Sequence, residues 1–183
     1  MRGWIRSIEP GVLILAALGL LLLPMRWVAA FLLAAVFHEL CHLLGVWLCG
    51  GQVRGFTAGV GGVILRAEGL SRGQLLFCTL AGPMGSFLLL PLGRWMPALA
   101  VCGLVQAVCN LLPLGTLDGA QALAHLCRIF LQPRTAWRIC RAAEGLCIVG
   151  VCAMAILLWW GILPLALILW VCYRRKTEKS LAN

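Results

Sequence analysis

Two histidines and a glutamate, His38, Glu39 and His42, form an H-E-x-x-H pattern. On a helix, positions i and i+4 lie on one face, so the two imidazoles can bind a single metal ion. Glu39 follows His38 directly and can reach a water molecule on that ion. Zinc hydrolases divide the work in this way, with histidine ligands and a glutamate as general base. The pattern therefore predicts zinc-dependent hydrolysis.

The residues around this pattern are almost all apolar. The run VAAFLLAAVFHELCHLLGVWLCG, residues 28–50, is long enough to cross a lipid bilayer. Placing a carboxylate and two imidazoles in hydrocarbon costs several kcal/mol unless they have partners. A polar pair that holds transmembrane helices together is the second explanation for these residues. We favour a functional site, because ionisable residues within a membrane usually mark one.

The composition is that of a membrane protein. Hydrophobic residues make up 62% of the 183 residues and charged residues only 11%, which excludes an ordinary soluble domain. The net charge of +9 raises the question of nucleic acid. The basic residues, however, lie in short segments between apolar runs, as membrane topology requires, so no nucleic-acid partner is expected.

The ten cysteines contain no C-x-x-C pair, and most lie within apolar runs. We interpret them as small packing residues and not as disulfides or metal ligands. Cys41 lies inside the H-E-x-x-H pattern but next to His42, so it points away from the face that carries the ligands.

The apolar runs predict an all-α polytopic membrane protein with about six transmembrane helices. The first span is expected at 11–24, extended by the residues before it, because 14 residues fall short of the ~20 that a spanning helix needs. Further spans are expected at about 27–49, at 74–92 with a kink at Pro83, and at 95–114. A short amphipathic helix and then a basic loop around Pro133 should fill 118–141, and two short helices turning near Gly161 should fill 142–173.

A glycine-rich stretch, residues 50–73, separates the second and third spans. Val53, Gly55 and Thr57 alternate with their neighbours at a period of two, and the residues 59–62 carry a turn signal. We interpret the stretch as a small β-hairpin, with a plain glycine-rich loop as an equal alternative. An exposed strand of this kind can accept an extended peptide.

The basic residues are distributed unequally between the two sides of the membrane. In a six-span arrangement only Arg26 and Arg94 fall in outer loops, and the other Lys and Arg residues fall in cytoplasmic segments. The positive-inside rule then predicts that both termini are cytoplasmic. It also places His38, His42 and Asp118 nearer the cytoplasmic side.

A catalytic zinc ion needs a third protein ligand. The candidates are Asp118, His125, Glu144 and the cysteines. Asp118 is the strongest, because it follows a membrane helix in a glycine-flanked turn that can aim its side chain inward. His125 is interpreted as a surface or supporting imidazole, and Glu144 as a charge at the start of a helix, where the helix dipole favours it.

Three segments together resemble a known family: HELCH, AGPMGS at 81–86 and NLLPLGTLDG at 110–119. They are similar to the site-2 proteases, which are intramembrane zinc metalloproteases, and within these to the compact bacterial branch related to the sporulation protease that activates a pro-sigma factor. The resemblance covers about residues 27–125. It implies that Asp118 is the third zinc ligand, Glu39 the general base, and Asn110 a residue near the scissile bond.

The chain departs from the family pattern at three positions. Ser86 replaces the usual Asn of A-G-P-x-x-N, Thr116 stands where Pro is common, and Ala120 stands where a second Gly is common. We expect that none of these residues contacts a proposed ligand. We therefore expect them to affect the positioning of the substrate and not catalysis.

The resemblance implies a single intramembrane metalloprotease domain over residues 1–183, without a separate soluble domain. Its expected activity is Zn²⁺-dependent cleavage within or beside a transmembrane segment of a membrane-embedded protein, in regulated proteolysis such as that of a sigma or anti-sigma factor. The expected location is the bacterial cell membrane, and a regulatory membrane partner is left open.

Two other functions compete with proteolysis. A metal transporter could use the same His and Asp residues as a transient site, and an inactive family member could serve as a scaffold. Transport predicts polar residues along a path to the outer face, and the outer halves of the expected spans contain almost none. The intact H-E-x-x-H pattern disfavours an inactive scaffold.

Overall fold

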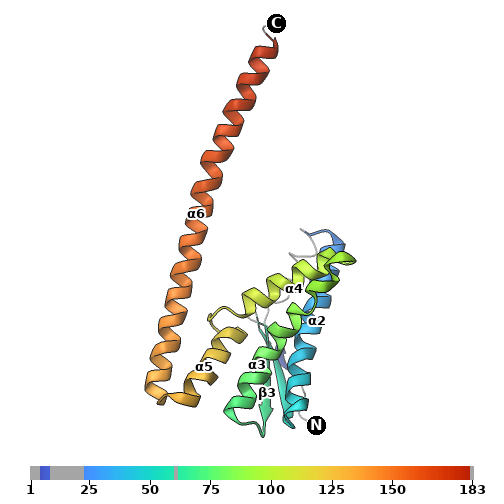
Figure 1. Cartoon of the computed structure of the whole chain (residues 1–183), viewed down its shortest axis with the longest axis vertical. Coiled ribbons are helices and arrows are strands. Elements are labelled where there is room, and N and C mark those ends of the chain that lie inside the picture. The colour runs from blue at the N-terminus through green and yellow to red at the C-terminus, as the bar shows by residue number, and fades with distance from the viewer. Residues whose placement is uncertain (1–4, 9–22, 60–61, 182–183) are drawn as a thin grey trace. The chain divides into compact units, whose positions relative to one another are not determined.

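The computed structural model describes residues 5–8, 23–59 and 62–181 (Figure 1). The chain divides into two units, residues 1–144 and residues 145–183, and every contact discussed below lies within the first. The expected first span falls almost wholly on residues 9–22 and lies outside the described part of the chain. The protein is mainly helical, as the sequence predicts, with one small sheet.

Two helices of the first unit are long and apolar enough to cross a membrane. Helix α2, Met25–Leu48, has 24 residues and a length of about 36 Å, which exceeds the thickness of a hydrocarbon core. Helix α3, Arg72–Phe87, begins at Ser71, which forms a capping box with Gln74, and a 3₁₀ helix, η1, Leu90–Arg94, prolongs it. These helices match the expected second and third spans.

Helix α4, Pro97–Asn110, is shorter than the span expected at 95–114. Its 14 residues extend about 21 Å, less than the thickness of a bilayer core. The helix ends before Pro113 because proline cannot donate the backbone hydrogen bond that a further turn requires.

The sheet contains three strands: β1, Ile5–Ile8, β2, Gln52–Gly59, and β3, Gly62–Glu68. Strands β2 and β3 are antiparallel, so the glycine-rich stretch between α2 and α3 adopts a paired β conformation. Strand β1 pairs with β2 in parallel. The prediction that the residues before 11 extend the first helix is therefore wrong, because the backbone of Ile5–Ile8 satisfies its hydrogen bonds by pairing with β2.

Helix α5, Asp118–Phe130, is the expected short amphipathic helix. The basic loop expected around Pro133 is not a loop: helix α6, Pro133–Leu181, begins there, and Arg134, Arg138 and Arg141 lie on its first turns. Proline suits this place because a first-turn residue needs no N–H donor and the fixed φ of proline matches a helix.

The turn expected near Gly161 is also wrong, because the backbone of α6 continues unbroken through Gly161 and Pro164. Apolar helices tolerate such residues where local adjustments satisfy the freed backbone groups. The segment Pro133–Leu157 of α6 is the third candidate that is long and apolar enough to span a membrane. The described residues thus provide three such helices, and the predicted total of six remains a prediction.

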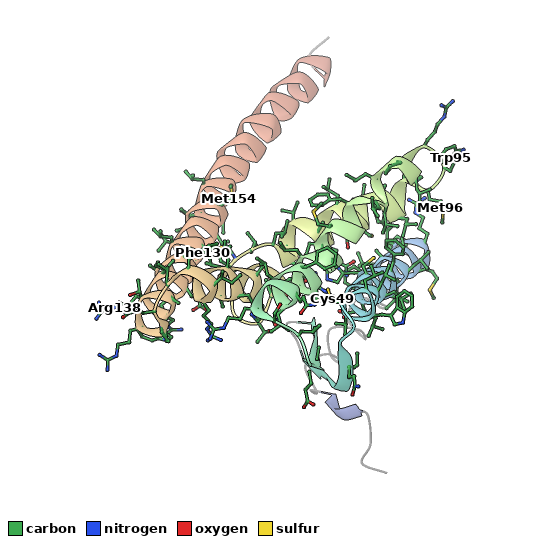
Figure 2. All side chains as sticks on the ribbon, turned by 60° about the horizontal axis from the view of Figure 1, so that its bottom comes forward. Cys49, Trp95, Met96, Phe130, Arg138 and Met154 are labelled. Atoms are coloured by element: carbon green, nitrogen blue, oxygen red, sulfur yellow. The ribbon has the colours of Figure 1, made fainter. Side chains whose placement is uncertain are left out.

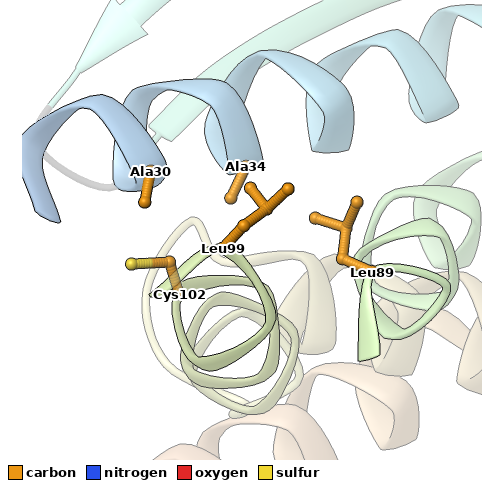
Figure 3. Packing of buried hydrophobic residues seen from close by; sticks show 5 residues of the cluster. All are labelled: Ala30, Ala34, Leu89, Leu99 and Cys102. Carbon is orange, nitrogen blue, oxygen red and sulfur yellow. The ribbon is translucent and has the colours of Figure 1, made fainter. Parts of the chain in front are cut away.

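Small side chains of α2 let the neighbouring helices approach closely (Figure 3). Ala30 and Ala34 face Leu99 and Cys102 of α4, and Leu89, which follows α3, completes the cluster. Close approach through small residues is typical of helix packing within membranes, where dispersion contacts replace the hydrophobic effect.

Large apolar side chains cover the outside of these helices instead of filling a core. Phe31 and Leu40 of α2 are about half exposed, and Trp95 and Met96 project away from the ribbon between η1 and α4 (Figure 2). Such surfaces are unfavourable in water but suit contact with lipid. Together with the long apolar helices, they define an integral membrane protein.

Candidate metal centre

Helix α2 brings the two histidines of the H-E-x-x-H pattern to one buried point. His38 and His42 lie one turn apart, and their Nε2 atoms are 3.1 Å apart. Their rings meet edge to face, with centroids 4.8 Å apart. The i, i+4 spacing therefore does place both imidazole nitrogens where they can bind one metal ion.

Asp118, at the first position of α5, completes the group. Its Oδ2 lies 3.0 Å from His38 Nε2 and 3.2 Å from His42 Nε2. In a tetrahedral zinc site with bonds of 2.0–2.1 Å, the ligand atoms lie roughly 3.3–3.4 Å from one another. The three observed separations are only slightly shorter, so His38, His42 and Asp118 can hold one metal ion.

The outward nitrogen of each imidazole has an acceptor on α3. His42 Nδ1 donates to the backbone oxygen of Cys78 at 2.8 Å, and His38 Nδ1 lies 2.9 Å from Ser86 Oγ, which can accept its proton when Nε2 faces a metal ion. With the proton on Nδ1, the lone pair of Nε2 faces Asp118. Metal-binding histidines usually carry this kind of outer hydrogen bond, which fixes the tautomer and the orientation of the ring.

The small residues of AGPMGS make room for the centre. A Cβ atom at Gly82 would lie 2.2 Å from Nε2 of His42, and one at Gly85 would lie 2.2 Å from Sγ of Cys41. Helices α2 and α3 lie side by side (Figure 1), so any side chain at these two positions would separate them. The predicted role of AGPMGS in close helix packing is confirmed, and Gly82 is directly beside a metal-facing nitrogen.

The turn before α5 aims Asp118 at the histidines. A Cβ atom at Gly119 would lie 2.0 Å from the backbone oxygen of Leu111, so only glycine lets the start of α5 lie against the end of α4. Burial opposes the charge of Asp118, but the imidazoles of His38 and His42 hold the pKa of its carboxyl below the usual value. The carboxylate is therefore ionised and available as a ligand at neutral pH.

Two further predicted site residues border the centre. The side-chain amide of Asn110, the last residue of α4, has its Nδ2 3.5 Å from His38 Nε2. Glu39 is half-buried on α2, close enough to His42 for their charges to interact. The structure therefore gathers His38, Glu39, His42, Asn110 and Asp118 in one region, although they come from three helices.

The other ligand candidates lie elsewhere. Within the part of the chain that the structure describes, the metal-binding group does not include His125, Glu144 or a cysteine. His125 is half-buried on α5, and its pKa is lowered by burial and by the charge of Arg128. The cysteines whose side chains are described are free thiols.

Glu144 does not lie at the start of a helix, so that interpretation is wrong. Because α6 begins at Pro133, Glu144 is three turns along it. Its carboxylate accepts hydrogen bonds from the backbone N–H of Gly115, at 3.2 Å, and from Arg141, at 3.0 Å. It thus contacts the loop that precedes Asp118.

The expectation that Ser86 has no contact with a ligand is wrong as well. Ser86 is fully buried, and its hydroxyl accepts the hydrogen bond from His38 described above. Sequence reasoning missed this contact because residues 38 and 86 are on different helices. The four-residue spacing of Cys78, Gly82 and Ser86 along α3 was a usable signal, because it places all three on one face.

The fold and the site define a helical integral membrane protein with a buried His-His-Asp centre. No protein-family model and no curated protein sequence matches the chain significantly. Among solved structures, the chain is similar to the site-2 protease from Methanocaldococcus jannaschii, with a TM-score of 0.56 and 18% sequence identity. The match covers 86% of this chain and 78% of that one. The chain therefore has the site-2 protease fold, in agreement with the resemblance in its sequence.

Exchange of Gly82 for alanine should prevent metal binding. The added methyl group would collide with Nε2 of His42, so either the ring or α3 must move. We expect Gly82→Ala to retain little metal, as measured by elemental analysis of purified protein. Gly73→Ala on the same helix is the control, because a Cβ there meets nothing within 4 Å. Equal metal content in both variants would contradict this account.

Removal of Asp118 should have a different effect from removal of His125. Asp118→Ala deletes one of three converging ligand atoms and should lose most of the bound metal. His125→Ala should keep about one metal ion per chain, because His125 lies outside the group. The same elemental analysis measures both variants, and the reverse pattern would make His125 the third ligand.

Proposed function

We propose that this protein is an intramembrane zinc metalloendopeptidase that cleaves membrane-embedded proteins within or beside a transmembrane segment. The observation that carries the proposal is the convergence of His38 Nε2, His42 Nε2 and Asp118 Oδ2, all within 3.0–3.2 Å of one another, beside a glutamate on the same helix. The site-2 protease fold supports the same activity. The catalytic core corresponds to about residues 27–125 of one protease domain.

In this proposal His38, His42 and Asp118 would hold Zn²⁺. When bound, zinc acts as a Lewis acid and lowers the pKa of a water molecule towards about 7. Glu39 accepts the proton of the attacking water and passes it to the leaving amine. Asn110, beside His38, donates hydrogen bonds to the substrate backbone through its amide.

The sheet offers a place for an extended substrate. A helical substrate hides its carbonyl groups in internal hydrogen bonds, so it must unwind locally before hydrolysis. Strand β3 is at one edge of the described sheet, while β1 occupies the outer edge of β2. We assign β3 as the strand that pairs with the unwound segment, because an edge strand presents unpaired backbone groups.

The proposed setting is regulated proteolysis in a bacterial cell membrane, with a membrane-bound regulator such as a sigma or anti-sigma factor as substrate. The charge distribution supports an active site nearer the cytoplasm: Arg54, Arg66 and Arg72 follow the end of α2 that carries His42. The cytoplasmic position expected for both termini rests on the same charge distribution and stays a prediction.

Glu39→Gln should abolish cleavage without loss of zinc. The amide has nearly the shape of the carboxylate but cannot accept a proton from water. General acid–base catalysis contributes roughly 10²–10⁴-fold, so product formation should fall by that factor. A tagged single-span substrate co-expressed with the protein, together with zinc analysis of the same membranes, provides the measurement.

The matched control for this experiment is Glu178→Gln, the same exchange in the polar tail, which should leave cleavage unchanged. Cleavage at the unmodified rate in Glu39→Gln would remove Glu39 from the mechanism. Zinc flux across the membrane without any peptide product would instead identify a metal transporter.

Reporter fusions should locate the active site relative to the membrane. A reporter that functions only in the cytoplasm should be active when it is fused after Leu70, next to the sheet. It should be inactive when it is fused after Trp95, beyond the other end of α3. The opposite pattern would invert the proposed orientation and place access to the zinc on the outer side.

A further inference from the structure

Helix α3 presents three residues at four-residue spacing to the metal centre: Cys78, Gly82 and Ser86. All three are buried, and each meets a histidine of α2. Cys78 and Gly82 meet His42, and Ser86 meets His38. We call these residues the α3 stripe. Because α2 and α3 run antiparallel here, residues on one face of α3 contact both imidazoles.

The two imidazoles depend on this stripe in different ways. His42 donates to a backbone oxygen, that of Cys78, which every amino acid at position 78 would supply. In the tautomer that leaves Nε2 free for a metal ion, His38 donates to the Oγ of Ser86, which a single substitution can remove. Of the two outer hydrogen bonds, only the one to His38 is therefore specified by a side chain.

We propose that Ser86 is a positioning residue that holds metal ligand His38 in the tautomer and ring orientation needed for metal binding. The proposal deepens the proposed function, since it concerns the same zinc centre. Ser86 contacts the outer nitrogen of His38 and not the three converging atoms, so in this proposal it acts through His38. The departure from the family pattern at position 86 is expected to affect the positioning of the substrate, and the contact with His38 adds a role in orienting a metal ligand.

The physical argument rests on the burial of Ser86. The residue is 0% exposed, and a Cβ atom at Gly103 of α4 would lie only 3.0 Å from its backbone oxygen. Helix α4 therefore closes this side of the centre, and solvent cannot replace a missing hydroxyl. Without Oγ, the Nδ1–H of His38 would be a buried donor without an acceptor, which is unfavourable.

The His38 ring can relieve that cost in two ways, and both weaken metal binding. It can rotate towards another acceptor, which turns Nε2 away from His42 and Asp118. Alternatively, the proton can move to Nε2, where Asp118 Oδ2 lies 3.0 Å away and would accept it. The lone pair then no longer faces the centre. Loss of such outer partners typically lowers metal affinity 10–100-fold.

The test compares variants of the full-length protein in detergent, with zinc affinity measured by competition with a chromogenic chelator. We expect Ser86→Ala to bind zinc 10–100-fold more weakly than the unmodified protein. Ser86→Thr, which retains the hydroxyl, should recover most of the affinity. Thr79→Ala is the matched control, because Thr79 is a hydroxyl residue on α3 that donates to Leu75 of its own helix. Its zinc affinity should not change.

A second measurement separates positioning from packing. The thermal midpoint without metal should be similar in Ser86→Ala and Thr79→Ala, while the rise in the midpoint on addition of zinc should be smaller in Ser86→Ala. The visible spectrum of bound Co²⁺ should also change in Ser86→Ala and not in Thr79→Ala.

Unchanged zinc affinity in Ser86→Ala would overturn the proposal. A loss of affinity in both Ser86→Ala and Thr79→Ala, or a low midpoint without metal in both Ser86 variants, would also overturn it and assign a packing role. None of these measurements uses a substrate, so a failure of the Ser86 proposal can be distinguished from a failure of the proposed proteolysis. An unmodified protein that binds zinc normally but cleaves nothing would refute the protease and not the role of Ser86.

Discussion

Burying ionisable side chains inside an apolar helix bundle costs free energy, and the packing around the candidate metal centre must offset that cost. His38, His42 and Asp118 are buried or nearly so, and each would be unfavourable there alone. Each Nδ1 has a hydrogen-bond partner on α3. The two Nε2 atoms and a carboxylate oxygen converge on one point, where a shared proton or a metal ion can lie between them. The geometry that brings these polar groups together is therefore also one that can hold a metal ion.

Helix α3 is as important to the centre as the helix that carries the histidines. Its glycines at 82 and 85 let it approach α2 so closely that backbone and hydroxyl oxygens reach the imidazoles. In a membrane, where apolar surface gains little from association, such close packing and interhelical hydrogen bonds provide the main attraction between helices. The residues that bring α2 and α3 together are thus also the residues that contact the two histidines.

The sheet and the loop before α5 connect this centre to its surroundings. Strands β2 and β3 follow directly after the helix that carries His38 and His42, and β3 is at one edge of the described sheet. On the other side, Glu144 of α6 accepts a hydrogen bond from Gly115, three residues before Asp118. The turn that carries Asp118 is therefore held by the close contact of Gly119 with the end of α4 and by a contact from α6.

The sequence by itself determined what lies within one turn or one continuous segment. The H-E-x-x-H spacing and the long apolar helices follow from local periodicity, because helix geometry repeats over a few residues. The same kind of pattern favoured strands in the glycine-rich stretch only as much as a loop, and the structure shows the strands Gln52–Gly59 and Gly62–Glu68. Only the tertiary structure decided that Asp118 and not His125 meets the histidines, that Ser86 supports His38, that Ile5–Ile8 joins the sheet and that α6 continues through Gly161. The first three depend on contacts between segments about 50 to 80 residues apart, as in the pairs His38–Ser86 and His38–Asp118. Such contacts are set by which helix faces pack together, and a local pattern does not encode that choice.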